Sequence, residues 1–191
     1  PISRLPGPGI VEPPLFFLFP PRGDAGVTDE PLYAHYLRVT GAPHPGAVEV
    51  MAAMQSDGER VIREVILGPC DRPLLLMKQM AHHLVDLSWD FLVETTHVLL
   101  IRDPAEMLPS LAQNLAQPTL RDTGLALQTT LFDHLRRLGQ APPVLDARQL
   151  LLNPRSVLSQ LCMRIGIPFD EAMLHWPPGP RREDGIWATH W

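Results

Sequence analysis

The chain has 191 residues, of which 45% are hydrophobic and 19% are charged, with a formal net charge of −5. A composition of this kind supports one globular domain with a sizeable hydrophobic core. The acidic balance argues against a nucleic-acid partner, because no basic stripe is present to neutralise phosphates.

Residues 1–22 are rich in proline and show no helical or strand periodicity, so we expect irregular structure there. The aromatic-apolar run at residues 15–19 is far too short for a membrane span, which needs about 20 apolar residues. It also lacks the basic start and cleavage pattern of a signal peptide. We therefore expect a cytoplasmic protein with no membrane partner, in which Cys70 and Cys162 are buried, reduced thiols.

An α/β domain is predicted to occupy residues 23–191, opening with a turn and a short helix up to Gly41. Thr28 or Asp29 is the expected N-cap, Pro31 lies near the first turn, and Gly41 ends the helix. The expected elements that follow are a helix at 46–58, a strand or short helix at 61–68, a buried strand at 73–80 and a helix at 85–96.

The most informative segment is the mainly apolar run at residues 97–101, which leads directly into Arg102, Asp103 and Pro104. Such a run predicts a buried parallel strand. Asp103 suits the N-cap of a following helix at 104–115, and Pro104 suits its first position. Arg102 is thereby placed at the carboxyl end of a strand, where open α/β sheets bind ligands, and a guanidinium there favours an anion.

The rest of the domain continues the alternation of strands and helices. Leucines at helical spacing predict an amphipathic helix within residues 119–139, and a short strand follows at 144–146. Asn153-Pro154 begins another helix, which Gly166 ends. This order predicts a three-layer α/β/α fold with a mainly parallel sheet.

The segment IRDPAEMLPS resembles the 3′-phosphate-binding segment of P-loop sulfotransferases, which carries an arginine and, eight residues later, a serine. Arg102 and Ser110 match this spacing. The resemblance implies that they hold the 3′-phosphate of PAPS (3′-phosphoadenosine 5′-phosphosulfate), the sulfuryl donor. The alternative is that Arg102 only caps its strand or pairs with Asp103 or Glu106.

The carboxyl-terminal part resembles the same family. The segment LLLNPRSVLSQLCMRIGIPFDEAML is similar to its late helix, and GPRREDGIWATHW is similar to its basic, glycine-containing loop. The resemblance implies phosphate contacts from Arg181, Arg182 and Gly185, with Trp187 as a packing wall. The alternative for the two arginines is a solvated pair beside acidic neighbours.

On the acceptor side, TDEPLYAHYL and PLLLMKQMAHHL resemble further segments of the family. They imply Glu30 as a candidate general base, with Lys78 as a candidate cation and His82 or His83 as an alternative base. The chemistry needs a base for the acceptor proton and a cation for charge on the leaving phosphate. The alternatives are that Glu30 is a carboxylate in the first turn of a helix and that the histidines are structural.

One signature of the family is not found. No segment similar to its first strand and W-S-G-P-R-x-x-S-T loop is present, and the proline-rich residues 1–22 stand where that segment is expected. We therefore expect a P-loop NTPase-like fold without the usual first strand and phosphosulfate loop, and a frame error or altered start is one hypothesis for this.

Two functions remain open. One is transfer of a sulfuryl group from PAPS to a small-molecule hydroxyl or amine acceptor without a metal. The other is a non-catalytic nucleotide-binding or interaction module that retains only the 3′-phosphate half-site. The acceptor, the oligomeric state and the ability of the chain to turn over are not fixed by the sequence.

Overall fold

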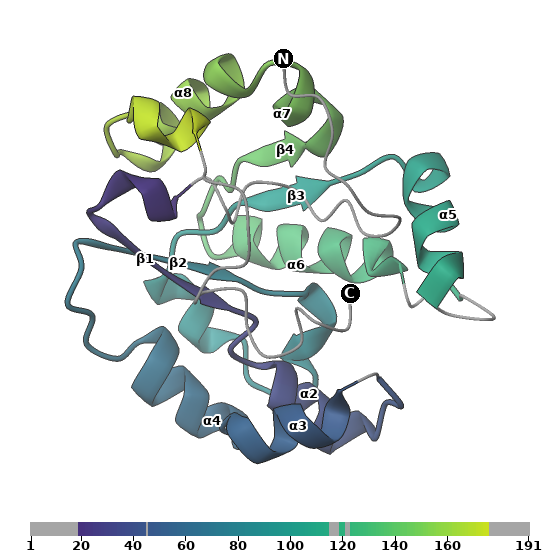
Figure 1. Ribbon diagram of the computed structural model, residues 1–191. Coiled ribbons are helices and arrows are strands. Elements are labelled where there is room, and N and C mark those ends of the chain that lie inside the picture. Colours follow the sequence, from purple (N-terminus) through teal and green to yellow (C-terminus); the bar gives the residue numbers. More distant parts are fainter. Residues whose placement is uncertain (1–18, 45, 115–118, 121–122, 176–191) are drawn as a thin grey trace.

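The computed structural model describes residues 19–44, 46–114, 119–120 and 123–175. Within these residues lie two small parallel sheets, each of two strands. The first pairs β1 (Ala25–Asp29) with β2 (Leu74–Lys78), and the second pairs β3 (Leu99–Ile101) with β4 (Val144–Asp146). The strand arrows all point in the same general direction (Figure 1), so the carboxyl ends of both sheets face the same side of the molecule.

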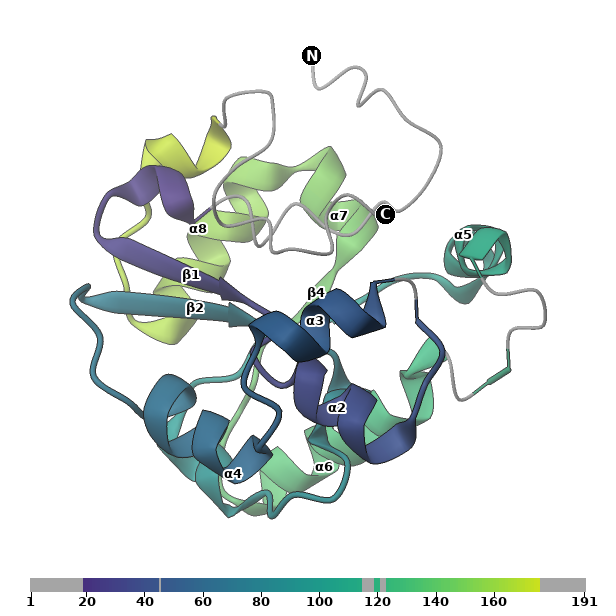
Figure 2. The same ribbon diagram turned by 60° about the horizontal axis from the view of Figure 1, so that its bottom comes forward.

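Helices make up most of the remaining described chain. The α-helices are α2 (Tyr33–Thr40), α3 (Ala47–Ala53), α4 (Gly58–Val61), α5 (Pro104–Asn114), α6 (Leu125–Arg137), α7 (Ala147–Leu152) and α8 (Pro154–Ile165). Shorter helical segments are η1 (Pro20–Arg22), the π-helix η2 (Ile62–Ile66), η3 (Ala81–Leu84), η4 (Asp90–Glu94) and η6 (Glu171–Leu174). Helices α7 and α8 lie on one side of the strands, and α2, α3 and α4 lie on the other (Figures 1 and 2).

Both sheets contribute to one shared core. Its buried members are Phe19, Ala25, Leu145, Leu150, Leu158, Leu161, Cys162 and Met173. Val27 and Leu76 from the first sheet and Leu100 from the second pack against this cluster. A common apolar core therefore joins strands that are not hydrogen bonded to one another. The alternation of strands and helices predicted from the sequence is confirmed as a mixed α/β fold with small parallel sheets.

Several element ends follow the local rules of the sequence. The carboxylate of Asp103 accepts the backbone N–H of Ala105 at 2.8 Å, as expected for the cap of α5. Gly41 and Gly166 end α2 and α8 in the left-handed conformation, at φ 64° and 76°. The segment after Gly58 takes the helical alternative, because α4 continues directly into η2.

Three expectations about local structure were wrong. Thr28 and Asp29 belong to strand β1 and cap no helix, since their backbone pairs with Met77 and Lys78. The helix expected at 85–96 is reduced to the short η4, followed by extended backbone at Thr95. Residues 54–57 separate α3 from α4, so the helix expected at 46–58 is interrupted.

The strands are also less buried than expected. All five residues of β2 are only partly buried, and in β3 only Leu99 is fully buried. Each sheet has only two described strands, so each strand has only one partner in its sheet. Cys162 is buried but Cys70 is exposed, and both are free thiols. None of the helices in the described ranges combines the length and apolar character that a membrane crossing requires.

Candidate functional site

The carboxyl ends of β1 and β2 bring Glu30 and Lys78 together from distant parts of the sequence. The Lys78 Nζ atom lies 2.9 Å from Oε1 of Glu30 and 3.5 Å from Oδ1 of Asp29. Glu30 is only 8% exposed, so its carboxylate is stabilised mainly by the Lys78 ammonium and little by bulk water. Two candidate catalytic residues predicted from separate segments therefore form one partly buried ion pair.

The backbone at Glu30 has an unusual conformation. Its N–H donates to the carbonyl oxygen of Lys78 at 2.9 Å, which extends the β1–β2 ladder by one residue. Its φ angle is 45°, in the left-handed region that non-glycine residues seldom occupy. Unfavourable backbone conformations of this kind cluster at functional sites, where the surrounding structure holds them in place.

Tyr33, in the first turn of α2, forms the next part of the site. Its hydroxyl is hydrogen bonded to Nδ1 of His44 at 3.0 Å, and its ring stacks on that of His83 with the centroids 5.2 Å apart. Burial raises the pKa of Tyr33 to about 12, and the negative charge of Glu30 acts in the same direction. Tyr33 is thus a neutral phenol placed beside the Glu30–Lys78 pair.

The two histidines predicted as alternative bases differ in environment. His83 is 1% exposed, and burial lowers its pKa well below the usual value, assisted by the nearby His82 and Lys78. It is therefore neutral near pH 7, and its Nδ1 has no hydrogen-bond partner among the described residues. His82 is only partly buried, and its ring makes edge contacts with Tyr36 at 4.9 Å and with His83 at 4.7 Å.

Three residues of this region were missed by the sequence analysis. Tyr33 lies within a segment whose resemblance was noted, but its role depends on His44, which no local pattern connects to it. Gln79 follows Lys78 and accepts the backbone N–H of Leu32 through Oε1 at 3.3 Å. Its Nε2 is buried and has no partner within the described part of the chain, so it remains able to donate a hydrogen bond.

Arg102 lies at the carboxyl end of β3, as predicted, and is partly buried. It forms no ion pair or hydrogen bond with the described residues, so the expected alternative of pairing with Asp103 or Glu106 is not observed. Asp103 instead caps α5, and Glu106 contacts Arg148 at 3.4 Å. A guanidinium without a carboxylate partner at this edge is free to bind an anion.

The other predicted donor-site residues are less fully described. Ser110 lies in α5, about 9 Å along the helix axis from Pro104 at a rise of about 1.5 Å per residue, but its side chain is outside the described part. Arg181, Arg182, Gly185 and Trp187 all lie outside the described residues. The phosphate contacts expected of these residues stay predictions.

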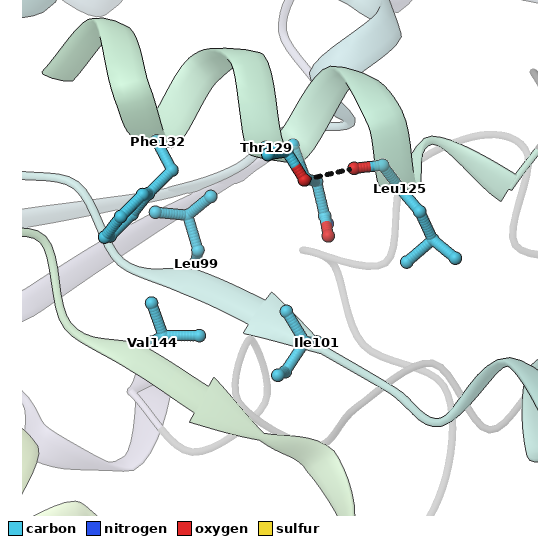
Figure 3. A pocket seen from close by; sticks show the side chains of 7 residues that line it. Leu99, Ile101, Leu125, Thr129, Phe132 and Val144 are labelled. Atoms are coloured by element: carbon cyan, nitrogen blue, oxygen red, sulfur yellow. Dashed lines mark hydrogen bonds between the residues drawn. The ribbon is translucent and has the colours of Figure 1, made fainter.

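A cavity of about 240 Å³ lies between the second sheet and α6 (Figure 3). Its lining residues are Leu99, Ile101, Leu125, Gln128, Thr129, Phe132 and Val144. The two polar residues are already engaged, because Gln128 Nε2 donates to the Leu100 carbonyl at 3.2 Å and Thr129 donates to Leu125 at 3.1 Å. The cavity is therefore lined mainly by apolar side chains, and two of them belong to β3, the strand that leads into Arg102.

Over residues 2–191 the chain matches the family model described as a sulfotransferase domain. The chain belongs to the sulfotransferase family. The family resemblance predicted from the sequence is thereby confirmed. Among its described residues, no group of three or more histidine, cysteine or acidic side chains is placed to hold a metal ion.

Curated relatives of this sulfotransferase-family chain include two proteins of Arabidopsis thaliana. They are named branched-chain-amino-acid aminotransferase-like protein 2 and branched-chain-amino-acid aminotransferase-like protein 1. Each is 35% identical over 178 residues, which is 93% of this chain and 32% of the relative. The chain thus spans about a third of the length of these relatives. No solved structure matches it.

Proposed function

We propose that the chain transfers a sulfuryl group from PAPS to the hydroxyl or amine of a small-molecule acceptor. The observation that carries this proposal is the partly buried contact of 2.9 Å between Glu30 and Lys78 at the carboxyl ends of two paired parallel strands. A base and a cation in contact are the two groups that sulfuryl transfer needs at the acceptor side. Membership of the sulfotransferase family supports the same reaction class.

In this proposal Glu30 is the general base. As the acceptor oxygen or nitrogen forms its bond to sulfur, its proton passes to the Glu30 carboxylate, and the bond between sulfur and the 5′-phosphate oxygen breaks. Protonation of Glu30 removes the nearer of the two carboxylate charges that hold Lys78, with Asp29 at 3.5 Å keeping the second, so the ammonium becomes more available to the negative charge on the departing 3′,5′-ADP. His83 is less suited to the base role, because its lowered pKa makes it a weak proton acceptor.

The donor would be held at the carboxyl ends of β3 and the following helix. Arg102 and Ser110 would bind the 3′-phosphate, with Arg181, Arg182 and Gly185 reinforcing the grip and Trp187 packing beside it. The partly buried guanidinium of Arg102, unpaired within the described residues, supports this assignment. The proposal includes a three-layer, P-loop NTPase-like sheet, and a cytoplasmic location is supported by the free thiols Cys70 and Cys162.

Turnover tests the acceptor half of the proposal. Purified chain is incubated with PAPS and a panel of alcohols, phenols and amines, and both 3′,5′-ADP and sulfated product are measured by mass spectrometry. Glu30→Gln keeps the size of the side chain but removes the base, and it should lower kcat by about 100-fold or more. Glu64→Gln is the matched control, because Glu64 forms an exposed ion pair with Arg60 at 2.9 Å, outside the proposed site.

Calorimetry separates the enzyme from the binding module. Binding of 3′,5′-ADP together with sulfated product supports the proposed enzyme. Binding without turnover of any acceptor would favour a module that keeps only the 3′-phosphate half-site. Equal activity of Glu30→Gln and wild type would contradict the assignment of Glu30 as the base.

A further inference from the structure

Adjacent strands place a second arginine at the same sheet edge as Arg102. In the parallel β3–β4 pair, Ile101 is opposite Asp146, and neighbouring strands lie about 4.8 Å apart. Arg102 follows Ile101 directly, and Arg148 follows Asp146 by two residues, in the first turn of α7. Both arginines therefore leave the sheet at its carboxyl edge, each beside the start of a helix.

A side-chain contact links the two strand-to-helix junctions. Nη1 of Arg148 lies 3.4 Å from Oε1 of Glu106, and Glu106 belongs to the first turn of α5. That turn begins two residues after Arg102, so the contact holds the Arg148 guanidinium toward the β3–α5 junction where Arg102 lies. The rest of α5 extends away from the strands (Figures 1 and 2).

The ion pair between Arg148 and Glu106 is exposed, so Arg148 can exchange Glu106 for another anion. The side chains of Arg148 and Glu106 are 67% and 40% exposed, and an ion pair this open to water contributes little to stability. A phosphate dianion carries more charge than a carboxylate and can accept two parallel hydrogen bonds from a guanidinium, whereas a single contact joins Arg148 to Glu106, so phosphate can displace the carboxylate.

Two further carboxylates lie at this edge, but both are engaged with backbone amides. Oδ1 of Asp103 accepts from Ala105 at 2.8 Å, and Oδ1 of Asp146 accepts from Gln149 at 3.1 Å. The positive ends of α5 and α7 partly offset these charges. Among the described residues, Arg102 and, once it releases Glu106, Arg148 can then bind an anion at this edge.

We propose that Arg148 is a second phosphate-binding guanidinium of the donor site, which exchanges its contact with Glu106 for the 3′-phosphate held by Arg102. This inference rests on the proposed function, because it takes the 3′-phosphate of the sulfuryl donor as the ligand. It adds a residue that neither the resemblance nor the arginine-to-serine spacing indicated.

Calorimetric titration with two nucleotides isolates the 3′-phosphate. Wild type and variants are titrated with 3′,5′-ADP and with 5′-AMP, which lacks only that phosphate. Arg148→Ala should weaken the binding of 3′,5′-ADP by about tenfold, the value of one charge-assisted hydrogen bond, and leave the binding of 5′-AMP unchanged. Glu106→Gln should strengthen the binding of 3′,5′-ADP by about twofold to threefold, because the competing carboxylate is removed.

The matched control is Arg164→Ala, since Arg164 is an exposed arginine of α8 that lies away from this edge. It should bind both nucleotides as wild type does, and thermal melting of each variant verifies folding. Arg148→Ala with wild-type affinity for 3′,5′-ADP would overturn the inference while leaving the proposed function intact. Wild type that fails to bind 3′,5′-ADP would overturn the donor half of the proposed function and this inference together.

Discussion

The hydroxyl of Tyr33 is hydrogen bonded to Nδ1 of His44 at 3.0 Å, which ties α2 to the connection that leads to α3. Tyr33→Phe removes this bond. The free energy of unfolding should fall by about 1 kcal/mol, measured by urea denaturation at pH 7. Tyr36→Phe is the control, since the Tyr36 hydroxyl has no hydrogen-bond partner within the described residues, and an equal loss there would contradict the assignment.

The alkaline titration of the protein should also depend on Tyr33. Burial raises the pKa of its phenol to about 12, from the ordinary value of 10.0. The raised pKa means that the folded state favours the neutral phenol, so its contribution to stability is present below pH 10 and is lost as the pH rises toward 12. The sequence contains only two tyrosines, so tyrosinate absorbance can follow the ionisation of Tyr33. Tyr33→Phe should abolish the step near pH 12 and make the alkaline loss of stability shallower.

The junction after β3 shows what the sequence determines locally. Asp103 caps α5 through its own neighbour Ala105, and Pro104 begins the helix, so a few adjacent residues suffice to predict both the strand end and the position of Arg102. Gly166 likewise ends α8 by its own left-handed backbone. Interactions between sequence neighbours can be inferred without knowledge of the rest of the fold.

One strand was missed because its extended backbone depends on a distant partner. The strand β1, AGVTD, contains glycine and aspartate, which disfavour strands, and it is extended because it pairs along its length with β2. The contacts within the candidate site also depend on elements that are distant in the sequence. Glu30 and Lys78 were chosen separately by resemblance, while their contact and the Tyr33–His44 bond exist only once the strands and α2 are placed. No local pattern connects Arg148 to Glu106 either.

Replacing Gly58 by alanine tests the packing around α2, because the structure predicts a loss of stability where an exposed helix would gain it. In an exposed helix, replacing glycine by alanine gains up to about 1 kcal/mol. Here a Cβ at Gly58 would lie 2.6 Å from Nδ1 of His35 and 2.8 Å from Cδ2 of Leu87. His35 is 2% exposed and is fixed by a hydrogen bond of 2.8 Å between Nε2 and the Val85 carbonyl, so it cannot move aside easily.

Gly58→Ala should therefore lower the free energy of unfolding by about 1 to 3 kcal/mol, as overpacking does. Thermal melting at pH 7 measures the change. The double variant Gly58→Ala, His35→Ala removes the group that would be struck, and it should lose less than the sum of the two single changes. A melting temperature of Gly58→Ala at or above that of wild type would contradict the packing around His35.

Arg22 connects the start of the described chain to the segment after α8. Its guanidinium donates to both carboxylate oxygens of Asp24 at 2.9 Å and, through Nη1, to the Pro168 carbonyl at 2.7 Å. The side chain is buried, and an ammonium cannot reproduce this planar set of contacts. Arg22→Lys should lower the free energy of unfolding by about 1 to 2 kcal/mol in urea. Arg155→Lys, at an exposed pair with Glu171, should have little effect.

The Arg22–Asp24 pair also predicts how stability responds to acid. The hydrogen bond from Arg22 lowers the pKa of the Asp24 carboxyl below its ordinary value of 3.8. A depressed pKa in the folded state means that this contribution is present above the unfolded pKa and is lost as the pH falls through the folded one. Asp24→Asn cannot titrate, so its stability should fall less steeply than that of wild type below about pH 4, as followed by circular dichroism in urea. Parallel curves for the two proteins would show that the carboxylate is not held by Arg22 in solution.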